Sequence, residues 1–200
     1  MIDITNRENI NIKDKKVTIL GLGLSGTSAA KLANHMGAIV FGSDLSMNED
    51  VLSNSWELMN IHHIATETGI NSDRIFDSDL WVVSPGISKN SELIINGQNH
   101  NIPIVGEIEF ASWFTSSKII AITGSNGKTT TSHILAKMCK THKVNGRMAG
   151  NMGIPFSECV FNELLNPDKK TIYILEISSF QMEFIEHFCP HIALYTNITE

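Results

Sequence analysis

The segment Ile119-Ile-Ala-Ile-Thr-Gly124-Ser-Asn-Gly127-Lys128-Thr129-Thr130 decides the fold of the second half of the chain. An apolar strand runs into a glycine-rich loop that carries Gly-Lys-Thr, and an amphipathic stretch follows. Backbone N–H groups of such a loop cradle a polyphosphate, while Lys128 supplies a cation to the phosphates and the Thr129 hydroxyl can ligate Mg²⁺. The G-x-x-G-K-T spacing is shorter than the common P-loop pattern, which would place a glycine at Ile122. We therefore predict a phosphate-binding loop of an unusual, short type.

A carboxylate follows a second apolar run. Thr171-Ile-Tyr-Ile-Leu-Glu176 has the composition of a buried strand that ends in an acid. A buried strand does not end in a charge without a partner, and a P-loop needs a carboxylate near its metal ion. Glu176 is therefore predicted to be a metal ligand, either directly or through water.

An earlier glycine turn has a different pattern. Val17-Thr-Ile-Leu-Gly21-Leu-Gly23-Leu-Ser-Gly26 is a strand followed by G-x-G-x-x-G, whose helix start favours an anion. A further strand ends near Asp44, which is placed to accept hydrogen bonds from a ribose or a base. Taken alone, this pattern favours an NAD-dependent oxidoreductase, and a packing turn without a ligand remains the alternative.

Short β-branched runs alternate with amphipathic stretches along the whole chain. The strands expected from them are 17–20, 38–42, 80–83, 118–123, 171–177 and 192–196. The expected helices are 26–36, 49–59, 92–100, 108–113, 128–140 and 180–188. This alternation predicts an α/β protein with parallel sheets. The polar stretch Thr115-Ser-Ser117 would separate a Rossmann-like domain (1–115) from a P-loop NTPase-like domain (116–200).

The composition restricts the partners. The 200 residues carry a net charge of −6, which disfavours a general nucleic-acid binder. We also expect no membrane partner, because no apolar run approaches the length of a membrane helix. The odd number of cysteines (three) fits reduced thiols in the cytoplasm.

Six motifs occur in order along the chain. They are Gly21-Leu-Gly-Leu-Ser-Gly26, Ser84-Pro-Gly-Ile87, Gly106-Glu-Ile-Glu109, Thr123-Gly-Ser-Asn-Gly-Lys-Thr-Thr130, Gly150-Asn-Met-Gly-Ile-Pro155 and Glu176-Ile-Ser-Ser-Phe-Gln181. This series closely resembles the ATP-dependent Mur ligases of peptidoglycan synthesis, and within them the members that add D-glutamate. The resemblance implies that the first domain holds the UDP part of a UDP-muramoyl substrate instead of NAD.

The resemblance also implies a role for individual residues. The residues expected to contact UDP-N-acetylmuramoyl-L-alanine are Leu24, Ser25, Asp44, Ser84, Pro85, Gly86, Asn151, Ser178 and Gln181. The residues expected to bind ATP are Gly124, Ser125, Asn126, Gly127, Lys128, Thr129 and Thr130. Catalytic roles are expected for Lys128, Glu176 and Asn151, and Mg²⁺ is expected on Thr129 and Glu176.

The implied reaction is ligation with ATP cleaved to ADP and phosphate through an acyl phosphate. In the family, an Asp-His pair follows the strand that corresponds to 192–196, and its histidine binds a second Mg²⁺. A C-terminal domain of the family binds D-glutamate. Because the 200 residues include neither, we expect the P-loop domain (116–200) to be truncated and the D-glutamate-binding domain to be absent. We therefore expect this chain alone to be an inactive, monomeric part of the enzyme. Three alternatives stay open: a module that only binds the UDP substrate, an NAD-dependent oxidoreductase, and another ligase of the superfamily, such as the L-alanine-adding enzyme or a folylpolyglutamate synthase.

Overall fold

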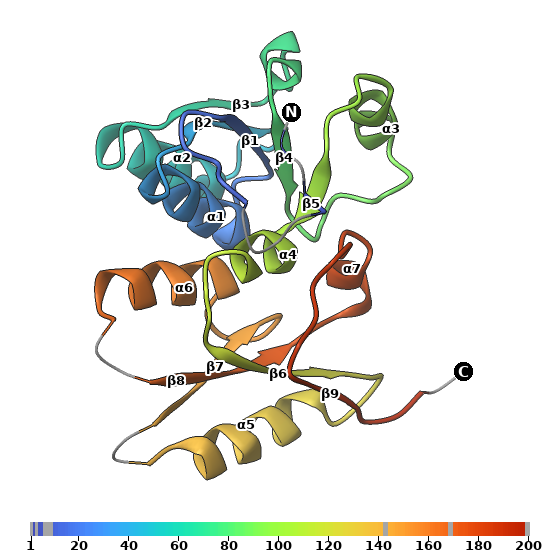
Figure 1. The fold of residues 1–200 in the computed structure, drawn as a ribbon. Helices are drawn as coiled ribbons and strands as arrows, with labels where there is room; N and C mark the ends of the chain where they lie inside the picture. Colours follow the sequence, from blue (N-terminus) through green and yellow to red (C-terminus); the bar gives the residue numbers. More distant parts are fainter. Residues whose placement is uncertain (1, 3, 6–9, 142–143, 168–169, 199–200) are drawn as a thin grey trace.

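The fold is known from a computed structural model, which describes residues 2, 4–5, 10–141, 144–167 and 170–198. Strands and helices alternate and form two parallel sheets, so the predicted α/β class is confirmed (Figure 1). The sheets lie in two blocks, the first built from the N-terminal half of the chain and the second from the C-terminal half. The 115/116 domain boundary itself stays a prediction.

The first block contains a five-stranded sheet with strand order β3-β2-β1-β4-β5. Its elements are β1 (Lys16–Leu20), α1 (Leu24–His35), β2 (Ile39–Asp44), α2 (Glu49–Asn60), β3 (Ala65–Thr68), the 3₁₀ turn η2 (Asp73–Phe76), β4 (Leu80–Val83), α3 (Glu92–Asn99), β5 (Ile104–Gly106) and α4 (Glu107–Ser112). The order reverses at β1, between β2 and β4. In open parallel sheets, a ligand crevice forms at such a point, outside the carboxyl ends of the strands.

The second block contains a four-stranded sheet with order β7-β8-β6-β9. Its elements are β6 (Lys118–Thr123), α5 (Lys128–Cys139), β7 (Asn145–Gly150), α6 (Phe156–Leu165), β8 (Thr171–Glu176), α7 (Ser179–Met182) and β9 (Ile192–Tyr195). Parallel pairing places Ile122 opposite Glu176, so the P-loop and the acid emerge at the same sheet edge. This juxtaposition is what the sequence analysis required of a metal ligand.

Several elements differ from the sequence predictions. The sequence patterns missed strands β3, β5 and β7 and helix α6. The missed strands are short or polar: β5 has three residues, and β7 reads Asn-Gly-Arg-Met-Ala-Gly. The predicted helix 180–188 is wrong in extent, because α7 ends at Met182 and the chain continues to Phe188 without a regular helix.

Helix α6 joins the two blocks. It lies with α4 between the sheets, while α5 covers the far face of the second sheet (Figure 1). The α1–α6 interface contains an ion pair between Lys31 and Glu158 at 2.9 Å and an edge-to-face contact between His35 and Phe161. One apolar core cluster therefore runs through both blocks, from Val17 and Leu80 to Ile119, Phe156 and Tyr173.

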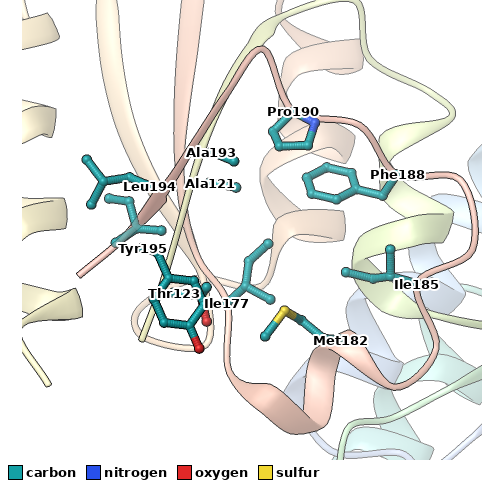
Figure 2. Close-up of a pocket in the computed structure, with 11 residues that line it drawn as sticks. Ala121, Thr123, Ile177, Met182, Ile185, Phe188, Pro190, Ala193, Leu194 and Tyr195 are labelled. Atoms are coloured by element: carbon teal, nitrogen blue, oxygen red, sulfur yellow. The ribbon is translucent and has the colours of Figure 1, made fainter. Parts of the chain in front are cut away.

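An apolar cavity of about 390 Å³ lies beside the edge strand β9. Figure 2 shows Met182, Ile185 and Phe188 on the opposite side of this cavity from strands β6 and β9. Ile192 and Tyr195 of β9 are more than half exposed. Because its lining is almost entirely apolar, this cavity is not a phosphate site. Among the described residues, no helix is long and apolar enough to cross a membrane.

Glu107 is a buried carboxyl group between α4 and the start of α6. It is 3% exposed, and its Oε1 accepts a hydrogen bond from the Ser157 N–H. Within the described residues, Glu107 Oε2 and Ser157 Oγ are buried without a hydrogen-bond partner. Burial raises the pKa of Glu107 to about 7, although the backbone N–H groups of Ser157 and Phe156 act to lower it.

Glu107→Gln should reduce the pH dependence of stability. The folded pKa of about 7 lies above the reference value of 4.5. The contribution of Glu107 to stability is therefore complete below pH 4.5 and is lost as the pH rises through 7. Urea unfolding at pH 5 and 8 should show that the variant removes roughly 1–3 kcal/mol of this pH-dependent difference. The exposed Glu186→Gln serves as control; an unchanged pH profile in Glu107→Gln would contradict the assignment.

The glycines of the first turn have separate structural roles. A Cβ on Gly26 would lie 1.8 Å from the Gly21 carbonyl oxygen, whereas a Cβ on Gly23 would meet no atom within 4 Å. Gly26 thus permits close packing of α1 on β1, and Gly23 leaves open space above the turn.

Gly26→Ala should destabilise the chain strongly, and Gly23→Ala should not. The added methyl group in Gly26→Ala forces the turn and α1 apart, at a cost of roughly 1–3 kcal/mol or more. Gly23→Ala is its matched control in the same turn, where the expected cost is below about 1 kcal/mol. Thermal unfolding monitored by circular dichroism measures both; equal melting temperatures would refute the packing role.

Candidate functional site

The predicted phosphate-binding loop lies between β6 and α5. Gly124 and Gly127 have positive φ angles of 132° and 83°, so the turn needs glycine at both positions. A Cβ on Gly124 would also lie 2.2 Å from Thr196 Oγ1. The first N–H groups of α5, beginning at Lys128, have no acceptor within the helix and are directed at this loop. They form the donor set that a phosphate requires.

Lys128 folds back over the loop. Its Nζ donates hydrogen bonds to the carbonyl oxygens of Gly124 at 2.6 Å and Ser125 at 3.3 Å. The ammonium group is thus held at the mouth of the loop by backbone acceptors that it can exchange for phosphate oxygens.

Glu176 brings three predicted residues together. Its Oε2 accepts a hydrogen bond from Thr129 Oγ1 at 2.9 Å, and its Oε1 accepts one from Asn151 Nδ2 at 3.2 Å. The backbone N–H of Asn151 also donates to the Glu176 carbonyl oxygen at 2.8 Å. Glu176 is 2% exposed, so its carboxylate has a fixed position at the end of β8.

The donor set at this point fits Mg²⁺. A carboxylate and a hydroxyl are hard oxygen ligands, and Mg²⁺ typically uses one or two carboxylates together with phosphate oxygens and water. Glu176 and Thr129 are the residues that would hold such an ion. Within the described part of the chain, no three His, Cys, Asp or Glu side chains are grouped to bind a metal by themselves.

The first block contains a cleft of about 690 Å³, called the first cleft, at the carboxyl ends of β1, β2 and β4. Six of the nine residues predicted to contact the UDP substrate line it: Leu24, Ser25, Asp44, Ser84, Pro85 and Gly86. Ser84 Oγ also donates a hydrogen bond to the Gly21 carbonyl oxygen at 2.9 Å, which fixes the two loops to each other.

Asp44 organises the glycine turn. Its Oδ2 accepts the Leu22 N–H at 2.6 Å, and its Oδ1 accepts the Ser46 N–H at 2.7 Å. Each carboxylate oxygen has a second lone pair that a ligand can use. The uracil contact of Asp44 stays a prediction, and the structure adds a role in holding the turn.

The other three predicted substrate residues lie elsewhere. Asn151 is at the Glu176 site. Ser178 and Gln181 form a capping box at the start of α7: Ser178 Oγ accepts the Gln181 N–H, and Gln181 Oε1 accepts the Ser178 N–H. Gln181 is 7% exposed. These two side chains are engaged in helix capping, and their contact with substrate stays a prediction.

The sequence analysis assigned no role to Asn197. Its carbonyl and Oδ1 oxygens accept the N–H groups of Ser125 and Asn126 at 3.0 Å each, and its Nδ2 donates to the Asn126 carbonyl oxygen. Asn197 therefore shapes the P-loop from the end of β9. Asn48 and Asn71 also line the first cleft without having been predicted. Asn71 lies in the loop after β3, and Asn48 caps α2, where its Oδ1 accepts the Val51 N–H at 2.9 Å.

The fold and the two candidate sites define a class: an α/β block with a P-loop joined to a Rossmann-like block, each with a glycine-rich turn at the carboxyl edge of a parallel sheet. Sequence comparison identifies the family. The MurD-like N-terminal domain of Mur ligases matches residues 15–106, and the Mur ligase middle domain matches residues 122–200. The chain belongs to the Mur ligase family and carries these two domains.

Individual relatives agree with this assignment. The chain is 37% identical over 194 residues to UDP-N-acetylmuramoylalanine--D-glutamate ligase of Chlorobium chlorochromatii and 40% identical over 192 residues to that of Chloroherpeton thalassium. These alignments cover 95% and 94% of this chain but only 40% of each relative. A murein peptide ligase from Psychrobacter arcticus shares the fold, with a TM-score of 0.57 at 20% identity over 93% of this chain and 43% of that structure.

Glu176→Gln should weaken the dependence of ATP binding on Mg²⁺. The amide keeps an oxygen for Thr129 but lacks the negative charge that attracts the ion. Titration calorimetry with a non-hydrolysable ATP analogue, with and without Mg²⁺, should show the Mg²⁺ enhancement of the wild type reduced about tenfold or more. Glu186→Gln, an exposed change outside the site, is the control, and an undiminished enhancement in Glu176→Gln would contradict the metal assignment.

Proposed function

We propose that this chain provides the UDP-substrate and ATP sites of a ligase that adds D-glutamate to UDP-N-acetylmuramoyl-L-alanine. The observation that carries the proposal is the meeting of Thr129, Glu176 and Asn151 beside a short P-loop, in a chain whose first block has a separate cleft. The names of the relatives, which the chain matches along nearly its whole length, supply the substrate.

Each group has a part in the proposed reaction. The P-loop N–H groups and Lys128 would hold the β- and γ-phosphates of ATP, and Mg²⁺ on Thr129 and Glu176 would offset the charge of the triphosphate. Asn151 would keep the Glu176 carboxylate in position. The carboxylate of the muramoyl-alanine, anchored through its UDP end in the first cleft, would then approach the γ-phosphate without strong repulsion. Transfer of the γ-phosphoryl group to this carboxylate would release ADP and form an acyl phosphate. The amine of D-glutamate would then attack the acyl carbon, lose a proton and expel phosphate, giving the amide bond between the L-alanyl carboxyl group and D-glutamate, in the cytoplasm.

An NAD-dependent oxidoreductase is the contrasting function. It accounts for the first glycine turn but leaves Lys128 and the buried Glu176–Thr129 pair without a use. The ligase accounts for both blocks.

The choice of ligand for the first cleft separates these functions. We expect calorimetry to show that the chain binds UDP-N-acetylmuramoyl-L-alanine at least about tenfold more tightly than NAD, since each tenfold requires only one well-made hydrogen bond to a charged group. Tighter binding of NAD would overturn the proposal.

Lys128→Ala should separate the two sites. It removes the ammonium group from the P-loop and should reduce ATP affinity about tenfold or more, because charge-assisted hydrogen bonds to phosphate are lost. Binding of UDP-N-acetylmuramoyl-L-alanine in the first cleft should change less than about twofold, because distant sites act independently. Equal losses of both affinities would contradict the assignment of the sites to separate blocks.

A further inference from the structure

Glu109 is a fully buried carboxylate at the junction of the two blocks. It lies on α4 and is 0% exposed. Its Oε2 accepts three successive backbone N–H groups, from Glu186 at 3.1 Å, His187 at 2.9 Å and Phe188 at 2.7 Å. Its Oε1 accepts the indole N–H of Trp113 at 2.9 Å. A buried carboxylate needs such donors, and three converging N–H groups make a strong site for one.

The segment that Glu109 holds, Glu183–Phe188, belongs by sequence to the second block but is attached to the first. The Gly106 N–H donates to the Phe184 carbonyl oxygen at 2.9 Å, and the Lys89 N–H donates to Glu183 Oε2 at 3.2 Å. The Phe184 side chain packs in the apolar cluster of the first block with Leu20 and Trp81. Lys89 lies just after the Ser84-Pro-Gly-Ile87 loop, which lines the first cleft.

The same segment leads directly to the P-loop. After Phe188 the chain enters β9, whose start is fixed by a hydrogen bond from the His191 N–H to the Ile119 carbonyl oxygen at 2.9 Å. Immediately after β9, Asn197 accepts the N–H groups of Ser125 and Asn126. A single continuous segment of the chain therefore connects the residues that Glu109 binds to the loop that is proposed to hold ATP.

We infer that Glu109 is a positioning residue: it fixes the Glu183–Phe188 segment and, through it, β9 and Asn197. In this way it sets the position of the P-loop relative to the first cleft. The role of the P-loop in this inference rests on the proposed function. Glu109 does not line the first cleft, and the hydrogen bonds of its carboxylate are to Trp113 and to the Glu186–Phe188 backbone. Its carboxylate acts through the backbone, so its charge and its two acceptor oxygens matter more than its contacts with side chains.

Glu109→Gln tests the inference in this chain. The amide replaces one acceptor oxygen by a donor and removes the charge, so at least one set of N–H groups loses its acceptor. Hydrogen–deuterium exchange should be about tenfold faster or more at the amides of Glu186–Phe188 and also faster at Ser125 and Asn126. Amides in β1 should keep their exchange rates. Unchanged exchange at Ser125 and Asn126 would overturn the connection to the P-loop.

Ligand affinities distinguish positioning from general stabilisation. In Glu109→Gln, the affinity for ATP with Mg²⁺ should fall about fivefold or more, while the affinity for UDP should change less than about twofold. A uniform fall in both affinities with a lower melting temperature would overturn the positioning role. If the wild-type chain binds neither nucleotide, the proposed function fails. The exchange at Ser125 and Asn126 then decides the inference about Glu109 by itself.

A reciprocal pair of variants covers the case in which Glu109→Gln does not fold. His187→Pro removes one of the three N–H donors without touching the carboxylate, and His187→Ala keeps that N–H while removing the exposed imidazole. His187→Pro should speed exchange at Phe188, Ser125 and Asn126, and His187→Ala should not. Equal behaviour of the two variants would show that the backbone contact with Glu109 has no influence on the loop.

Discussion

The hydrogen bonds to the buried Glu176 carboxylate hold together the elements of the second block at the P-loop. Glu176 ends β8, accepts a hydrogen bond from the first turn of α5 through Thr129, and accepts another from the chain after β7 through Asn151. Strand β8, helix α5 and the segment after β7 are thus fixed to one another at one point. Because parallel strands present their carboxyl ends at the same edge, one acid can serve both the architecture and a metal ion. Removing its charge would therefore disturb the fold as well as the proposed metal site.

The two blocks repeat one physical solution with different details. Each places a glycine-rich turn between a buried strand and a helix, and each uses an acid from a neighbouring strand to hold the site. In the first block Asp44 binds the backbone of the turn itself. In the second, Glu176 binds the hydroxyl that follows Lys128. Asp44 fixes the backbone of the turn beside the first cleft. Glu176 instead accepts a hydrogen bond from a hydroxyl group, and a carboxylate and a hydroxyl together are ligands that suit Mg²⁺.

The sequence predicted the strands and helices whose pattern is strong, whereas the roles of the residues within the six motifs stay predictions. Strands β1, β4, β6 and β8 are apolar runs buried in sheet centres, so their composition alone identifies them. The polar β7 and the three-residue β5 are strands because their neighbours pair with them, which no local pattern reveals. Likewise, the roles of Asn197 and Glu109 arise from contacts across 71 to 79 residues of chain. Periodicity and spacing cannot detect such distant pairings.

The core shared through α6 has a practical consequence for dissection of the chain. A cut between residues 115 and 116 would look natural in the sequence. It would, however, strip α1 and α4 of their contacts with α6, including the edge-to-face contact between His35 and Phe161. Each half would then expose apolar surface that is buried in the intact chain, and exposed apolar surface of this kind promotes aggregation. Expressing each named domain by itself would therefore divide a single hydrophobic interior.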